Sequence, residues 1–150
     1  MGERKRVLPP VYFLGALIAM TALHLGAPLA VVAEPPIRFL GAPLIALGVA
    51  GAAWGASLFG RAGTTVKPFE QSSVLVTEGP FRFTRNPMYL SMVAVLLGAW
   101  LLLGTMSPGL VVPIFAVAID RLFIRAEESM LSRTFGAAYD DYRRRVRRWI

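Results

Sequence analysis

Two long stretches of the chain carry almost no charge, and they constrain its fold more than any other feature. Between Val7 and Gly60 only Glu34 and Arg38 are charged, and between Asn86 and Ile119 no residue is. A helix on the surface of a soluble protein needs one polar face, and helices in these stretches would have none. Charged residues make up only 17% of the 150-residue chain, well below the usual quarter or so. The sequence therefore predicts one integral membrane domain.

Four apolar segments approach the length that crosses a bilayer, about 20 residues of helix. Glu34-Pro35-Pro36 ends the first one, because proline restricts its own backbone and that of the preceding residue. The last one becomes polar at Asp120 without a helix breaker, so we expect that helix to continue beyond the membrane. The predicted fold is all-α, a polytopic membrane helix bundle with about four transmembrane helices at residues 11–33, 37–59, 88–103 and 109–124.

Glycines in the second segment indicate close helix packing. Gly51 and Gly55 form a GxxxG spacing, which lets a neighbouring helix approach closely. We expect that neighbour to belong to the same chain. The Gly- and Ala-rich segments permit an oligomer without requiring one.

The basic residues fall into three groups: residues 1–6, the segment 60–86, and the tail that follows residue 120. Four spans place all three groups on one side, and Lys and Arg are enriched on the cytoplasmic side of membrane proteins. We therefore expect an inner or plasma membrane protein with both termini in the cytoplasm. The net charge of +7 flanks apolar segments, which is typical of contact with anionic membrane lipids and not with nucleic acid.

The tail, residues 121–150, has the pattern of a cytoplasmic amphipathic helix. Its apolar residues recur at steps of three and four, and its arginines take the other faces. Such a helix is expected to lie on the membrane with its basic face on lipid phosphates. This interpretation leaves Glu127 and Glu128 unexplained, because an anionic leaflet repels carboxylates. Either they pair with Arg121 or Arg125, or one of them binds the cationic group of a ligand.

Metal and thiol chemistry lack the residues that they need. The chain has no Cys and one His, which excludes disulfides and argues against a metal site. His24 lies within the first apolar segment, where we expect a hydrogen-bonded interior residue.

Two polar motifs flank the last two apolar segments. The first is GPFRFTRNPMYLS at residues 79–91, and the second is RAEESMLSRTFGAAYDDYRRRVRRWI at residues 125–150. In content, order and separation they resemble the isoprenylcysteine carboxyl methyltransferase and phospholipid methyltransferase superfamily of integral membrane enzymes. The resemblance covers roughly residues 73–150 and runs through Gly79, Pro80, Arg85, Pro87, Tyr89, Glu127, Glu128, Leu131, Phe135, Gly136, Tyr139, Tyr142 and Val146.

This resemblance implies an S-adenosylmethionine-dependent methyltransferase whose cofactor is held by the segments 60–87 and 121–150. Aromatic faces at Tyr89 and Phe81 would favour a nearby sulfonium, and Glu127 would hold the methionine ammonium. By position, the family's cofactor contacts would fall on Ser73, Val74, Leu75, Val76, Phe81, Asn86, Pro87, Met88, Tyr89 and Glu127.

The chain departs from the family pattern at three places. Asn86 stands where histidine is usual, and it keeps hydrogen bonds but cannot act as a base. Phe81 stands where tyrosine is usual. The arginine that holds a substrate carboxylate in carboxyl methyltransferases has no aligned counterpart, so Arg125 and Arg121 are candidates by proximity only.

The methyl acceptor is expected to be a lipid-like or amphiphilic molecule that enters from the bilayer, because every span is apolar. Methylation of a carboxyl or thiol group is the leading prediction. A phospholipid amine N-methyltransferase is the alternative, for which Glu128 and Tyr89 are candidate bases. Further alternatives are a nicotinamide-dependent membrane reductase and a membrane protein without catalysis.

Overall fold

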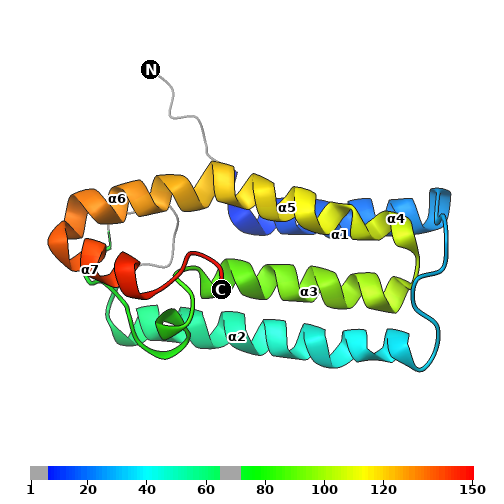
Figure 1. Cartoon of the computed structure of the whole chain (residues 1–150), viewed down its shortest axis with the longest axis horizontal. Helices are drawn as coiled ribbons and strands as arrows, with labels where there is room; N and C mark the ends of the chain where they lie inside the picture. The colour runs from blue at the N-terminus through cyan, green and yellow to red at the C-terminus, as the bar shows by residue number, and fades with distance from the viewer. Residues whose placement is uncertain (1–6, 65–71) are drawn as a thin grey trace, which may run out of the picture.

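The computed structural model describes residues 7–64 and 72–150. Over these residues the fold is helical (Figure 1), with one isolated β-bridge between Val31 and Thr105. The α-helices are α1 Pro9–Gly26, α2 Gly41–Arg61, α3 Pro87–Leu103, α4 Met106–Gly109, α5 Val111–Ile119, α6 Arg125–Phe135 and α7 Ala137–Arg145. Two 3-10 turns, η1 Ile37–Leu40 and η2 Gly79–Arg82, precede α2 and α3, and a π-helical turn, η3 Asp120–Ile124, joins α5 to α6.

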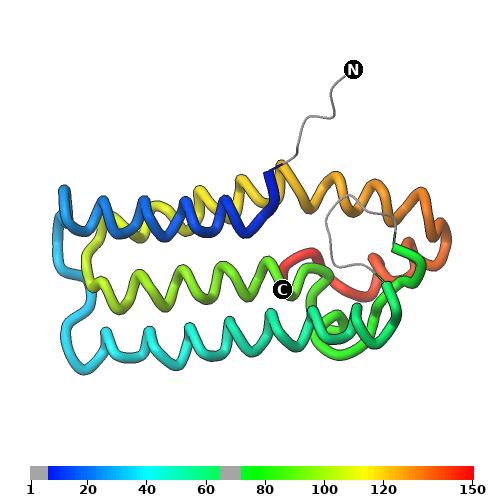
Figure 2. The backbone as a smooth tube through the Cα atoms, turned by 180° about the vertical axis from the view of Figure 1, so that it is seen from behind, coloured from blue at the N-terminus to red at the C-terminus, as the bar shows by residue number. Residues whose placement is uncertain are grey.

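The long helices run side by side along the molecule, with α1 and α5 on one side of α3 and α2 on the other (Figures 1 and 2). The core lies where α1, α3 and α5 meet, around Met20, Leu96 and Ile119. Outside it, large apolar side chains are exposed along the bundle, as a lipid environment requires.

Within the described residues, three helical stretches are long and apolar enough to cross a membrane: Pro9–Gly26, Ile37–Arg61 and Ser107–Phe135. The apolar helix α3 has 17 residues, slightly fewer than the roughly 20 that span a bilayer. The predicted all-α membrane bundle is therefore confirmed, while a fourth span at α3 stays a prediction.

The first helix ends earlier than predicted, at Gly26 and not near residue 33. Pro28 follows two residues later, and residues 30–33 contact the end of α3 instead of extending the helix. The amides of Val32 and Ala33 donate to the Gly104 carbonyl at 2.8 and 3.3 Å. As expected, His24 is hydrogen-bonded, with Nδ1 2.8 Å from the Thr105 hydroxyl. This end of the bundle is thus closed by hydrogen bonds between α1 and the α3–α4 turn.

The helices α2 and α3 pack almost backbone to backbone. Gly41, Gly48 and Gly55 are the buried residues of α2. A methyl group added at Gly48 would lie 2.8 Å from the Ser91 carbonyl oxygen of α3, and one added at Gly41 would lie closer still to Gly98. The predicted pair also faces α3, since a methyl group at Gly51 would lie 2.7 Å from Ser91 Oγ and one at Gly55 3.1 Å from Met88 Cγ. The prediction that Gly51 and Gly55 serve packing within the chain is therefore confirmed.

The tail differs from the single surface helix that the sequence predicts. The helix of α5 continues through η3 into α6, as expected, but it ends at Gly136, whose φ is +50°. The chain then folds back as α7 (Figure 1). Tyr139 and Tyr142 of α7 are buried, 1% and 4% exposed. The apolar face of α7 is therefore covered by protein and not by lipid.

Substitution of Gly48 by alanine is expected to destabilise the bundle by about 1–3 kcal/mol, because the new methyl group overpacks against backbone that cannot rotate away. Gly15→Ala is the matched control, since nothing lies within 4 Å of a methyl group there. Thermal unfolding in detergent should show a lower midpoint for the first variant only. Equal midpoints for both would contradict the close α2–α3 packing.

Candidate functional site at the charged end of the bundle

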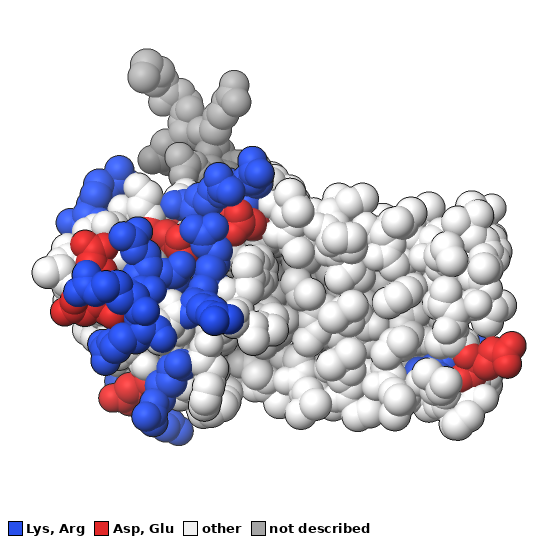
Figure 3. Space-filling view, viewed as in Figure 1, with Lys and Arg blue, Asp and Glu red and all other residues white. Residues whose placement is uncertain are grey.

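Charged side chains gather at one end of the molecule, over α6 and α7, and the middle of the bundle is free of them on the face shown (Figure 3). We call the end formed by residues 79–89 and 120–149 the charged end. Both motifs of the sequence analysis lie there. The contact between Tyr89 of the first motif and Glu127 of the second joins residues that are 38 apart along the chain.

The start of α3 is shaped by local sequence. Pro87 is the first helical residue, a position that tolerates the missing amide proton. The residue before a proline is kept out of the helical region, and Asn86 accordingly has φ −129° and ψ 56°. The Asn86 amide donates to the Thr84 hydroxyl at 3.2 Å, and both residues are buried. This turn aims the first residues of α3 at α6.

Two carboxylates of α6 meet this turn. The Tyr89 hydroxyl donates to Glu127 Oε1 at 2.5 Å. One residue on, Glu128 Oε1 lies 2.9 Å from Arg85 Nη2, and the two side chains are only 13% and 9% exposed. The carboxylates therefore face the α3 turn. The alternative ion pairs of Glu127 and Glu128 with Arg121 or Arg125 are not the ones formed.

Glu128 belongs to a chain of ion pairs. Arg148 donates to both of its carboxylate oxygens, from Nη2 at 2.6 Å and from Nε at 3.1 Å. The same guanidinium reaches Asp120 Oδ1 at 3.2 Å, and Asp120 Oδ2 accepts from Arg125 at 3.0 Å. The hydrogen bonds to Glu128 raise the pKa of Arg148. The order is therefore Arg85, Glu128, Arg148, Asp120, Arg125.

The tyrosines of α7 complete the buried side of the site. Tyr142 donates to the Phe81 carbonyl at 2.7 Å. Neither the Tyr139 hydroxyl nor Arg85 Nε has a hydrogen-bond partner among the described residues, although both atoms are buried. Burial raises the pKa of Tyr139 to about 12, so its phenol is neutral at physiological pH. The charged end thus keeps unused hydrogen-bonding capacity in its interior.

Several other predicted cofactor contacts lie outside the Tyr89–Glu127 and Arg85–Glu128 pairs. The Ser73 amide donates to Thr64 Oγ1, just beyond the end of α2, and the Val74 carbonyl accepts from the Ser72 hydroxyl. The Phe81 ring packs edge-on against Phe59, with centroids 5.5 Å apart. Residues 65–71 of the predicted segment 60–87 lie outside the described residues, as do residues 1–6 of the first basic group.

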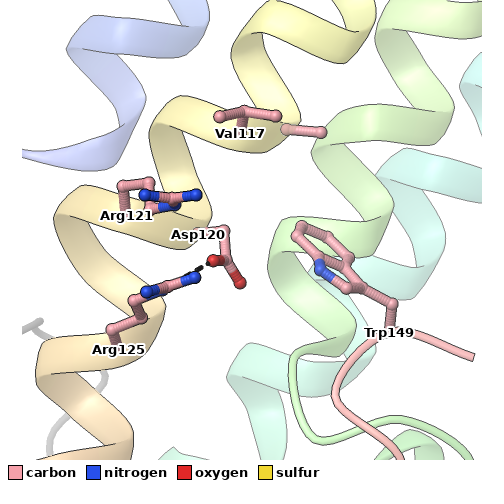
Figure 4. Close-up of a pocket in the computed structure, with 6 residues that line it drawn as sticks. Val117, Asp120, Arg121, Arg125 and Trp149 are labelled. Atoms are coloured by element: carbon pink, nitrogen blue, oxygen red, sulfur yellow. Dashed lines mark hydrogen bonds and ion pairs between the residues drawn. The ribbon is translucent and has the colours of Figure 1, made fainter.

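Arg121 and Arg125, the predicted substrate arginines, lie at a separate pocket of about 300 Å³. Its lining also includes Ala116 and Val117, and Trp149 faces Asp120 across it (Figure 4). The structure thus groups Glu127 and Glu128 with Tyr89 and Arg85. Arg121 and Arg125 lie on the same continuous helix but line the separate pocket.

Comparison with known proteins relates this chain to a protein family. The sequence model of the phospholipid methyltransferase family matches residues 36–138, which is more than half of the chain. The chain belongs to the phospholipid methyltransferase family. It is also 41% identical over 63 residues, 42% of its length, to the whole of an uncharacterized protein of Haemophilus influenzae.

One solved structure has a fold similar to that of this chain. It is that of a eukaryotic intramembrane Ras methyltransferase, ICMT, isoprenylcysteine carboxyl methyltransferase, with a TM-score of 0.65 and 24% sequence identity. The match covers 94% of this chain and 51% of that one, so the chain spans about half the length of the neighbour. The recognised superfamily is confirmed, and the protein is a membrane protein of a methyltransferase family.

Sequence analysis missed three residues of the charged end: Asp120, Arg148 and Trp149. Arg148 is one of five arginines between residues 143 and 148, and composition does not distinguish it from the others. Arg143 and Arg144 pair with aspartates on an exposed face, whereas Arg148 turns inward to Glu128. No signal in the sequence singles it out, because its role depends on Glu128 and Asp120, which only the fold brings opposite it.

Replacing Tyr142 by phenylalanine is expected to cost about 1–3 kcal/mol of stability, because the buried Phe81 carbonyl loses its donor. Tyr139→Phe is the matched control, since it removes a hydroxyl that has no hydrogen-bond partner among the described residues. Thermal unfolding should show a lower midpoint for the first variant and an unchanged or higher one for the second. The reverse order would contradict the hydrogen bonding assigned to α7.

Proposed function

We propose that the protein is an S-adenosylmethionine-dependent methyltransferase that acts on a lipid-like or amphiphilic acceptor. One observation carries the proposal. The two motifs that resemble the family's cofactor-binding segments meet at the charged end, through Tyr89–Glu127 at 2.5 Å and Arg85–Glu128 at 2.9 Å.

The residues present fit the cofactor's chemistry. S-adenosylmethionine carries an ammonium and a carboxylate at one end and supplies, when bound, a methyl group on a sulfonium. Glu127 offers a carboxylate whose orientation is fixed by the Tyr89 hydroxyl, and it would hold the ammonium. Arg85 Nε is a buried donor without an acceptor among the described residues, and it would hold the carboxylate. Charge-assisted hydrogen bonds of both kinds are the strong ones.

In this mechanism the protein aligns the reacting groups and excludes water. In-line displacement at a sulfonium needs little acid–base help when the acceptor is a carboxylate or a thiolate, so the gain comes from positioning. The buried turn from Thr84 to Asn86 provides the rigid wall. The predicted backbone contacts at residues 73–76 and at Pro87 and Met88 would hold the remainder of the cofactor.

The acceptor would enter at the pocket lined by Arg121, Arg125 and Trp149. Ala116 and Val117 give this pocket an apolar wall on the membrane-spanning side, while the guanidinium groups suit an anionic head. The combination favours an amphiphile with its polar head at the cytoplasmic surface, the side on which we place both termini. The same basic surface would contact anionic lipids.

A phospholipid amine is the second candidate acceptor, and the family match favours it. Asp120, which lines the same pocket, could attract an ammonium group. Methyl transfer from labelled cofactor to phosphatidylethanolamine vesicles, compared with transfer to a prenylated cysteine carboxylate, separates the two candidates. Label in the vesicle lipid alone would replace carboxyl methylation by amine methylation as the proposal.

Binding of S-adenosylhomocysteine to the detergent-purified protein tests the cofactor directly. We expect saturable binding by calorimetry and no binding of NADPH. Glu127→Ala should weaken the affinity roughly 100-fold or more, since a lost charge-assisted hydrogen bond costs about 1.5–3 kcal/mol and leaves an ammonium unpaired. The thermal midpoint should fall only modestly, because the Tyr89 hydroxyl loses its acceptor.

Asp141→Ala is the matched control, because it removes a carboxylate of the same charged end that is 58% exposed and pairs with Arg144. Its affinity should equal that of the wild type. Unchanged affinity in Glu127→Ala would overturn the site assignment. Binding of NADPH alone would favour a reductase.

A further inference from the structure

Segment 146–150 lies against the start of α3 and closes one side of the candidate site. It appears beside α3 from both sides of the molecule (Figures 1 and 2). The amide of Arg85 donates to the Arg147 carbonyl at 3.0 Å. The Arg148 carbonyl accepts from the Thr84 hydroxyl at 3.1 Å and from Asn86 Nδ2 at 3.0 Å. Three consecutive residues of the turn are therefore bound to this segment.

These bonds determine how Asn86 faces the site. A carbonyl oxygen needs a donor, so the amide nitrogen of Asn86 must be the atom that meets Arg148. The Oδ1 oxygen is then the atom left to accept a hydrogen bond from a ligand. Asn86 is a predicted cofactor contact, and its usable chemistry is thus set by the backbone of Arg148.

The side chain of Arg148 acts on the other half of the site. Its guanidinium forks onto Glu128 of α6 and reaches Asp120 of η3. Because its carbonyl is bonded to Thr84 and Asn86, Arg148 joins α6 to the turn before α3. The next residue, Trp149, packs against the apolar core and lines the pocket with Asp120. This packing of Trp149 anchors the segment that carries Arg148.

We propose that Arg148 is a positioning residue for the cofactor site: its guanidinium fixes Glu128 beside Arg85, and its carbonyl orients Asn86. The inference rests on the proposed function. It concerns a residue that makes no direct contact with the reacting atoms and that works through two elements at once.

The experiment measures the affinity for S-adenosylhomocysteine and the thermal midpoint of the full chain in detergent. Arg148→Gln removes the charge and the fork onto Glu128, and we expect an affinity roughly 100-fold weaker, the upper end of the cost of losing a side chain that orients a binding group. Arg148→Lys keeps the charge but cannot fork between carboxylate oxygens, and we expect roughly 10-fold weaker binding at an unchanged midpoint.

Arg144→Gln is the matched control. It removes the same charge from the same tail, but its side chain is 70% exposed and pairs only with Asp141 among the described residues. We expect wild-type affinity. If Arg148→Gln does not fold, the lysine variant decides the question, because it preserves the charge that stabilises the carboxylates.

The outcomes are distinct. A graded loss from lysine to glutamine, with midpoints within a few degrees of wild type, supports the positioning role. Wild-type affinity in both Arg148 variants overturns it and leaves the proposed function intact. A loss of affinity that merely follows a loss of thermal stability makes Arg148 structural and also overturns it. If the wild-type chain does not bind S-adenosylhomocysteine, the proposed function fails first, and the role of Arg148 fails with it.

Discussion

The pairing of carboxylates at the point where the longest helix leaves the apolar bundle is the constraint on which the site depends. Glu127 and Glu128 lie on the continuation of the charge-free helix α5, after a turn that carries Asp120 and Arg121, and a partly buried carboxylate there must be hydrogen-bonded or neutralised. Tyr89 at the start of α3 and Arg85 in the turn before it meet that need, and Tyr89 lies 38 residues from Glu127 along the chain. Satisfying the carboxylates therefore brings the two motifs together and makes the charged end a defined structure.

The apolar part of the bundle supports this meeting by fixing helix positions. The glycine face of α2 holds α3 at backbone distance, so α3 can neither slide nor rotate without overlap. Through η3, the helix of α5 reaches α6 without a break. The Tyr89–Glu127 pair is thus formed between two rigid helices, α3 and α6. Rigid elements are what precise binding geometry requires.

The family match and the site geometry address different levels of function. The match over residues 36–138 places the chain in the phospholipid methyltransferase family, while the likeness to ICMT concerns the fold. Neither identifies the acceptor. If the proposed function holds, the pocket at Arg121, Arg125 and Trp149 would suit an acceptor with an apolar body and a charged head. The pocket shares Asp120 with the chain of ion pairs that runs through Arg148 to Glu128.

The sequence by itself determined the membrane class, the helical fold, the glycine packing face and the two motifs, because hydropathy, proline and glycine act locally. It did not determine where the first helix ends or that the tail folds back at Gly136, since both depend on partners far along the chain. The choice of Arg148 among five neighbouring arginines belonged to the tertiary structure alone. Identical side chains differ only in what faces them, and only the folded chain sets Glu128 and Asp120 opposite Arg148.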